Sequence, residues 1–318
     1  MAAPTNTVIT TTGPGMREDL EDVIYRVAPE ETPFYSNIGT AKAANTYHEW
    51  QTEGLATPIV NNSALEGNAF TIAAGNLTSR VGNSCQIVTK AFGVSRTEDV
   101  VKKAGRTSEL NRQKVLKGIE AKRDFEFTII GNNPARAEGG GNGRLSGGAL
   151  AWIVSNTSVG AAGSNGGWSS APGPVAATNG TLRAFTEAQL KTVMAACFSA
   201  GGKPNQIYVG PIQKQEFSAF TGIASIRHEA AGTKMTALIG AADVYVSDFG
   251  NLTAIPHPYG LTRDALFVDP SMWAVGVLDG WKSVELAQVS DSTQYAVTYE
   301  ACLIGRNEKS SGAVRDLT

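Results

Sequence analysis

Hydrophobic and polar residues follow a helical spacing most clearly between residues 96 and 130. Apolar side chains there form one stripe, which Gly131 ends. Ser95 and Glu98 have the spacing of a capping box, in which two side chains satisfy free backbone donors at a helix start. If continuous, this helix would be roughly 50 Å long at about 1.5 Å per residue. Gly105 is the position at which it would kink or break.

Three shorter helices are predicted from the same kind of pattern. One within residues 16–27 places four apolar residues on a single stripe, namely Leu20, Val23, Ile24 and Val27. Another begins with a capping box formed by Thr186 and Gln189, and two glycines at 201–202 end it. The third covers residues 211–220.

Alternating residues near the start of the chain predict a long hairpin. Residues 45–53 read as a strand with Tyr47 and Glu49 on one side and His48 and Trp50 on the other. Residues 84–94 are rich in β-branched and aromatic residues and are expected to form the return strand. About thirty residues rich in Asn, Gly and Ser lie between them, and loops of that length are usually functional. We therefore predict a hairpin over residues 45–94 that leaves the body of the protein.

The rest of the chain predicts further strands without regular β-α-β alternation, which favours an α+β fold. Further strands are expected at 207–209, 243–247, 252–255, 266–268, 273–278 and 294–303, with a short one at 149–154 inside the glycine-rich region 131–180. Residues 1–15 are Thr, Pro and Gly with few apolar side chains, so they read as an arm that needs another surface to lie on.

The composition of the chain argues against several classes of function. The 318 residues carry a net charge of −2, and 18% are charged, below the roughly 25% of ordinary soluble domains. A near-neutral chain has no broad basic face for tight nucleic-acid binding. No apolar run reaches the roughly 20 residues of a membrane span, and no signal peptide is recognisable, so synthesis in a cytoplasm is expected.

The sequence offers no recognisable catalytic, cofactor or metal site. It has neither a P-loop nor a GxSxG elbow, and its three histidines are scattered. The three cysteines, Cys85, Cys197 and Cys302, are far apart and are expected to be core thiols. We expect a protein that is not an enzyme and has no cofactor, although a hydrolase built on the unit at 182–290 remains an alternative.

Several motifs together resemble one family of tailed-bacteriophage major capsid proteins. In order, they are PEETPF at 29–34, HEWQTE at 48–53, KRDFE at 122–126, Trp152-Ile153 with Asn156, and RNEK at 306–309 leading to Arg315-Asp316. The resemblance runs from about residue 16 to the C-terminus. It implies the Hong Kong 97 fold: an N-terminal arm (1–44), an E-loop hairpin (45–94), a peripheral domain with a spine helix and glycine-rich loop (95–181), an axial domain (182–290) and a return strand (291–318).

By the same resemblance, the chain is expected to self-assemble into the icosahedral shell around the double-stranded DNA of a tailed phage. Expected partners are further copies in pentamers and hexamers, a portal, a decoration protein and DNA contacted non-specifically. The expected location is the virion, after assembly in the bacterial cytoplasm. Because the chain starts at Met1, we expect a separate scaffolding protein rather than a cleaved segment. An encapsulin-like compartment is the competing kind of shell.

Contacts between copies are expected from aromatic and apolar residues of the arm and hairpin and from charged residues of the spine helix. The candidates are Phe34, Tyr35, Trp50, Leu65, Phe70, Glu120 and Arg123. Phe34 has an equally weighted alternative, which is burial in the subunit's own core. Lysine–asparagine crosslinks, known in the founding member, are not expected because the hairpin has no lysine between Lys42 and Lys90.

Overall fold

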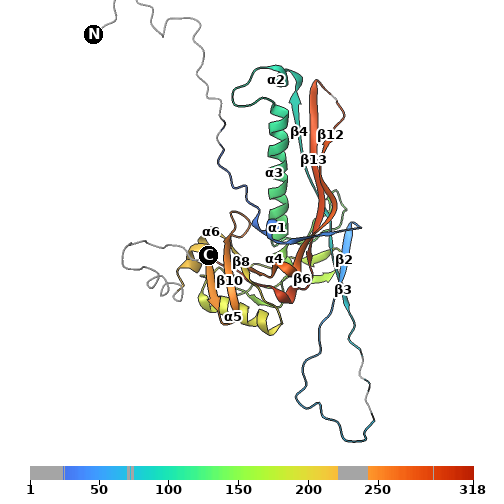
Figure 1. Cartoon of the computed structure of the whole chain (residues 1–318), viewed down its shortest axis with the longest axis vertical. Coiled ribbons are helices and arrows are strands. Elements are labelled where there is room, and N and C mark those ends of the chain that lie inside the picture. The colour runs from blue at the N-terminus through green and yellow to red at the C-terminus, as the bar shows by residue number, and fades with distance from the viewer. Residues whose placement is uncertain (1–23, 25, 70–71, 73–74, 221–242, 289) are drawn as a thin grey trace, which may run out of the picture.

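The computed structural model describes residues 24, 26–69, 72, 75–220, 243–288 and 290–318. The molecule is elongated: a long helix and a sheet lie side by side at one end, a second sheet with helices lies in the middle, and a hairpin projects at the other end (Figure 1). Helices and strands alternate irregularly along the chain, so the expected α+β class is confirmed.

The sheet beside the long helix has four strands in the order β1-β12-β13-β4. Their bounds are Gly39–Lys42 for β1, Trp273–Glu285 for β12, Ser292–Gly305 for β13 and Gln86–Ser95 for β4. β1 runs parallel to β12, and the other pairs are antiparallel. Along β13, Val297, Tyr299 and Ala301 are buried while their neighbours Thr298 and Glu300 are less so, as the alternation predicted.

The long helix is shorter than a continuous helix over 96–130 would be. Helix α2 (Arg96–Val100) ends after one turn, and α3 (Glu109–Ile130) begins separately. Gly105 in the gap adopts φ +72°, a left-handed conformation that no helix contains. Ser108 then supplies a second N-cap, because its hydroxyl accepts the N–H of Asn111. At about 1.5 Å per residue, α3 is about 33 Å long.

Helix α3 packs against β4 and β13 through a mainly aromatic core. Phe125 meets Tyr299 edge to face, with ring centroids 5.2 Å apart. Phe34 lies in the same core; it comes from α1 (Pro33–Asn37), a one-turn helix that ends the N-terminal segment. The segment before α1 is not helical at Ile24, Arg26 and Val27, and the remainder of the helix predicted at 16–27 and the arm at 1–15 lie outside the described residues.

The second sheet has six strands in the order β5-β14-β11-β8-β10-β9. Their bounds are Thr157–Ser158 (β5), Gly312–Val314 (β14), Ala265–Val268 (β11), Gln206–Val209 (β8), Gly250–Pro256 (β10) and Val244–Ser247 (β9). Helices α5 (Glu187–Ser199) and α6 (Pro211–Ser218) share a hydrophobic core with it. The capping box of Thr186 and Gln189 is present in both directions, as predicted.

The glycine-rich region contains a helix where the sequence pattern predicted a strand, and three short strands that were not predicted. Residues expected to form a short strand at 149–154 instead form helix α4 (Ala149–Trp152). The Arg315 guanidinium donates to the carbonyls of Leu150 and Ile153, which satisfies backbone groups that this short buried helix leaves free. The other small elements are β6 (Gly167–Ser170), β7 (Gly173–Val175) and the 3-10 turns η1 (Pro270–Met272) and η2 (Glu308–Ser310).

The hairpin exists, but its return strand is not the predicted one. Strand β2 (Tyr47–Thr52) pairs with β3 (Ser79–Ser84), whereas β4 pairs with β13 in the sheet beside α3. The expectation that residues 84–94 return the hairpin was therefore wrong. Strands β3 and β4 follow each other directly in the sequence. What distinguishes them is that β4 pairs with β13, some 200 residues later.

Candidate intersubunit interface

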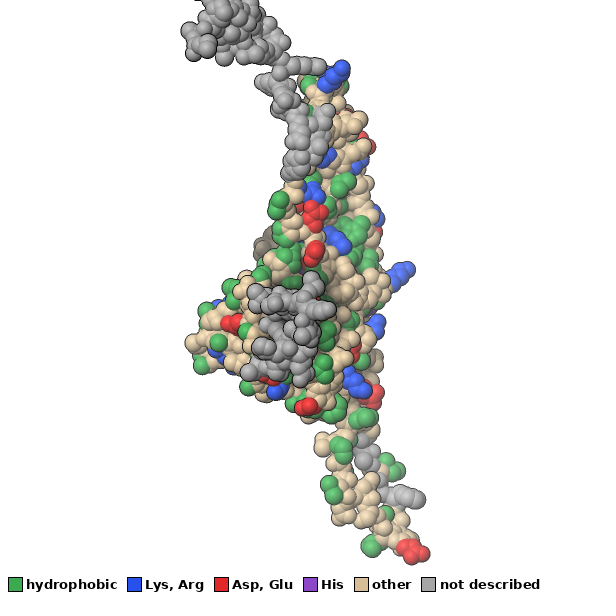
Figure 2. Space-filling model, turned by 60° about the vertical axis from the view of Figure 1, so that its left-hand side comes forward, with side chains coloured by type: hydrophobic (Ala, Val, Ile, Leu, Met, Phe, Trp, Pro, Cys, Tyr) green, Lys and Arg blue, Asp and Glu red, His purple; other side chains and the backbone are tan. Residues whose placement is uncertain are grey.

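The hairpin extends beyond the body of the subunit. After β2 and before β3, residues 53–78 contain no helix or strand among those described. This segment forms a wide loop that hangs clear of both sheets (Figure 1), and in Figure 2 it stands apart as a thin projection with several apolar side chains. Chain arranged in this way has little contact with its own subunit.

The described part of this loop combines small and polar residues with several exposed aliphatic side chains and almost no charge. Six large aliphatic residues have relative exposures between 74% and 105%, namely Leu55, Ile59, Val60, Leu65, Ile72 and Leu77. Glu66 is the one charged residue between positions 54 and 78 of the sequence. Single exposed apolar residues are common on protein surfaces, but six on one segment of chain with almost no charge are unusual.

The base of the hairpin is held firmly by the body. Trp50 Nε1 donates to the Gly305 carbonyl at 3.0 Å, and its ring lies 5.3 Å from that of Trp152. Asn83 is fully buried; its Nδ2 donates to the Leu303 carbonyl at 2.8 Å, and its Oδ1 accepts the Gly147 N–H at 2.9 Å. Buried polar groups that are satisfied in this way fix one geometry. The direction in which the loop leaves the body is thus determined within the subunit.

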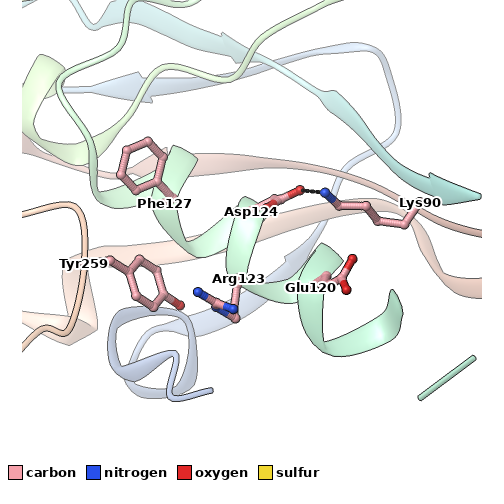
Figure 3. Close-up of a pocket in the computed structure, with 6 residues that line it drawn as sticks. All are labelled: Lys90, Glu120, Arg123, Asp124, Phe127 and Tyr259. Carbon is pink, nitrogen blue, oxygen red and sulfur yellow. Dashed lines mark ion pairs between the residues drawn. The ribbon is translucent and has the colours of Figure 1, made fainter. Parts of the chain in front are cut away.

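A charged surface pocket lies where α3, β4 and the loop carrying Tyr259 meet (Figure 3). Lys90 and Asp124 form an ion pair at 2.6 Å, and the Arg123 guanidinium lies 5.3 Å from the centre of the Tyr259 ring. Glu120 lines the same pocket. Burial raises the pKa of the Tyr259 phenol to about 12. The pocket measures about 350 Å³ and presents both signs of charge.

The aromatic candidates of the arm face inward. Phe34 is completely buried against Tyr208 and Trp273, at centroid distances of 5.4 and 6.2 Å. In this structure its side chain is not available to another copy, so core burial is the alternative that the structure favours. Tyr35 is half-buried, and its ring packs edge-on against Phe125.

A buried carboxylate that the sequence reasoning missed holds this part of the arm. Glu126 of α3 accepts the backbone N–H groups of Phe34 at 2.8 Å and Tyr35 at 2.7 Å. His257 Nε2 lies 3.0 Å from the same carboxylate. Glu126 closes the KRDFE motif at 122–126, but nothing in the sequence shows that it is buried or what it binds.

The structure separates the seven predicted contact residues into three groups. Leu65 is exposed on the hairpin, whereas Glu120 and Arg123 are half-buried and line the charged pocket. Phe34, Tyr35 and Trp50 make contacts within their own subunit. Phe70 lies outside the described residues.

None of the helices in the described part of the chain combines the length and the apolar character of a bilayer span. Within the same residues, no three His, Cys, Asp or Glu side chains gather closely enough to hold a metal ion.

Comparison with known proteins identifies the class of assembly. A family model described as SU10 major capsid protein matches residues 3–318. The major capsid protein of Escherichia phage Phieco32 is 25% identical over 322 residues, covering 91% of this chain and 90% of that protein. A chain of the Cyanophage A-1(L) capsid asymmetric unit superposes with a TM-score of 0.67 at 12% identity, covering 97% of this chain and 98% of that one. A structure from Gordonia phage Cozz superposes with a TM-score of 0.61 at 10% identity, covering 99% of this chain and 97% of that one.

The structural likeness, at such low identity, establishes the fold, and the family match over nearly the whole sequence establishes the family. Neither an encapsulin-like compartment nor a hydrolase is supported by these matches. The resemblance noted in the sequence motifs is therefore confirmed: the chain belongs to the SU10 major capsid protein family.

Proposed function

We propose that subunits of this capsid protein join into the icosahedral shell of a tailed phage by laying the hairpin of one subunit on the body of the next. The observation that carries the proposal is the set of six exposed aliphatic side chains in the loop between β2 and β3. A segment of this kind gains stability only when a second surface removes it from water.

The free energies of burial and of association agree with assembly from contacts that are individually weak. Full burial of one Leu, Ile or Val side chain contributes about 1.5–3 kcal/mol. Association costs an estimated 4–15 kcal/mol in lost translational and rotational freedom. One hairpin therefore yields only a modest surplus, and a stable shell requires that each subunit engage several neighbours at once.

The geometry favours head-to-tail contacts. The hairpin and the surface of α3 are different patches at different ends of the molecule (Figure 1). Contacts between unlike patches generate rings when the rotation closes, and pentamers and hexamers are the rings of an icosahedral shell. The described residues between β2 and β3 belong to no strand, and their free backbone groups would pair with the neighbouring subunit, as exposed strand-like segments commonly do.

The remaining partners follow from the function of such a shell. We propose a portal, a separate scaffolding protein and a decoration protein as further partners, with assembly in the host cytoplasm. The net charge of −2 suits loose, non-specific contact with packaged double-stranded DNA rather than a grip on phosphate groups. We also propose that the protein's role is structural rather than enzymatic.

Replacing residues 55–76 with a short Gly-Ser turn tests the proposal. This variant keeps β2, β3 and the buried contacts of Trp50 and Asn83. We expect a folded subunit with an unchanged circular dichroism spectrum that forms no shells in negative-stain microscopy. A full-length control in which only Glu53 is changed to Gln should assemble. Normal shells from the shortened variant would overturn the proposal.

A further inference from the structure

A second pocket, between α3 and the sheet beside it, is apolar at its floor and basic at its rim. Trp281 of β12 forms the floor; its indole stacks on Tyr299 with centroids 4.1 Å apart and planes 3° apart, and its side chain remains 38% exposed. Lys114 and Lys122 of α3 and Lys282 of β12 line the rim. The pocket measures about 390 Å³, so it is large enough for one or two side chains of a partner.

A glycine in the middle of α3 opens this pocket. Gly118 lies one turn from both Lys114 and Lys122 on the same stripe of the helix, and it lines the pocket. A Cβ placed there would meet no atom within 4 Å. Glycine inside a helix is less favourable than alanine, and no close neighbour in the subunit requires its small size. The empty space therefore has no purpose inside the subunit, which points to an occupant from outside.

The two lysines of α3 that line the pocket are not neutralised by carboxylates. Lys114 Nζ lies 3.6 Å from the centre of the Tyr295 ring, and Lys122 Nζ lies 5.2 Å from that of Tyr35. Neither takes part in an ion pair with any residue that the structure describes. Lys282 differs, because it pairs with Asp279 at 2.6 Å. The rim thus offers two positive charges beside an apolar floor.

The hairpin carries the complementary chemistry. Glu66 is its one carboxylate between positions 54 and 78, and it directly follows Leu65, whose side chain is 80% exposed. An aliphatic side chain next to an acid matches an aromatic floor bordered by ammonium groups. The hairpin loop and the parts of α3 and β12 that line the pocket lie toward opposite ends of the subunit (Figure 1), so a contact between them joins two copies.

We infer that the pocket around Gly118 and Trp281 receives Leu65 and Glu66 from the hairpin of a neighbouring copy. Leu65 covers the indole of Trp281, and the Glu66 carboxylate lies between the ammonium groups of Lys114 and Lys122. This inference rests on the proposed function and names the receptor for the hairpin. It also explains Gly118, since any side chain there would occupy the space that Leu65 requires.

Filling the pocket provides one test. Gly118→Leu should leave the dissociated subunit at least as heat-stable as the unmodified protein, because leucine favours helices and meets no obstacle. It should nevertheless raise the protein concentration needed for shell formation at least tenfold. Gly143→Leu is the matched control, because a Cβ there also meets no atom within 4 Å and the residue does not line the pocket. Normal assembly of Gly118→Leu would overturn the inference.

Charge reversal provides a second test, in which recovery of assembly by a combined variant excludes misfolding as the cause of the loss. Glu66→Lys alone, and Lys114→Glu with Lys122→Glu, should each reduce the yield of shells at least tenfold, and the triple variant should recover most of it. Glu53→Lys, at the foot of the hairpin, should have little effect. If the triple variant assembles no better than the others, the pairing is wrong.

The outcomes separate this inference from the proposed function. Failure of the shortened hairpin to assemble, together with normal assembly of Glu66→Lys, would overturn only the docking pocket. If the lysine variants build normal shells that retain less DNA, the pocket binds nucleic acid and the inference is overturned. A disulfide between Leu65→Cys and Ser283→Cys on different subunits, formed in shells but not in dissociated subunits, would support it directly.

Discussion

Glu126 and His257 are in contact in the core, with 3.0 Å between the carboxylate and Nε2, and both side chains are completely buried. Glu126 belongs to α3, His257 follows β10, and the same carboxylate accepts two N–H groups at the start of α1. His257 Nδ1 accepts the N–H of Tyr259, so the hydrogen of the neutral ring lies on Nε2 and is donated to Glu126. One carboxylate therefore joins the N-terminal segment, the long helix and the second sheet.

Removing this carboxylate should be costly. Glu126→Ala would leave two N–H groups and the imidazole without their acceptor in a dry site, which predicts a loss of about 3–5 kcal/mol of unfolding free energy. Urea unfolding of dissociated subunits measures it. Glu120→Ala, on the exposed face of the same helix, should change stability by less than about 1 kcal/mol. Equal effects of the two substitutions would contradict the role assigned to Glu126.

The hairpin's apolar residues should influence assembly without influencing subunit stability. Leu55→Ser removes one exposed aliphatic side chain, so the unfolding free energy should change by less than about 0.5 kcal/mol. If this residue is buried in the shell, the contact loses about 1.5–3 kcal/mol, which corresponds to roughly a ten- to hundredfold rise in the concentration needed for assembly. Light scattering against concentration measures the threshold. Leu182→Ser, a half-exposed leucine of the body, is the control and should leave it unchanged.

Alkaline pH should loosen the N-terminal segment. The Tyr259 hydroxyl donates to the Glu31 carbonyl at 2.9 Å, and burial raises its pKa to about 12. Because the folded pKa lies above the unfolded value of about 10, the neutral phenol's contribution is complete below pH 10 and is lost as pH rises toward 12. Between pH 8 and 12, the free energy of unfolding should therefore fall less steeply for Tyr259→Phe than for the unmodified protein. Identical slopes would show that this phenol does not contribute.

The thiols should be unreactive in the folded subunit. Cys85, Cys197 and Cys302 are all completely buried, so a reagent cannot reach them. Burial also raises the pKa of Cys197 to about 12, whereas the hydrogen bond with Cys302 lowers the pKa of Cys85, so the protection of Cys85 rests on its burial alone. Only the thiolate reacts readily, so a thiol reagent at pH 8 should modify none of them until the protein is unfolded, when it should modify all three. Rapid reaction of any thiol in intact subunits would contradict the packing described.

Local signals in the sequence predicted the parts of the fold that depend on local chemistry. The capping residues Ser95 and Thr186 start helices as expected, and the alternation around Tyr299 matches the buried face of β13. The separation of β3 from β4 could not be predicted, because it depends on pairing with β13 far along the chain. The helix break was foreseen only as an alternative, at Gly105.

The projecting hairpin was predictable from the sequence, but the surroundings of the candidate contact residues were not. A loop so poor in anchors indicated a projecting hairpin, and Leu65 is exposed there as expected. The burial of Phe34 within its own subunit could not be predicted from the sequence, because an aromatic residue after a proline suits a core as well as an interface. Gly118 gave no signal either, since its significance appears only when the space around it is known.

Hydrogen exchange of residues 54–69, compared between dissociated subunits and assembled shells, tests the central claim most directly. The account predicts that these amides exchange rapidly in the subunit and at least a hundredfold more slowly in the shell, while α3 is protected in both. Equal protection of the hairpin in both states would contradict the claim that it is buried by neighbouring subunits.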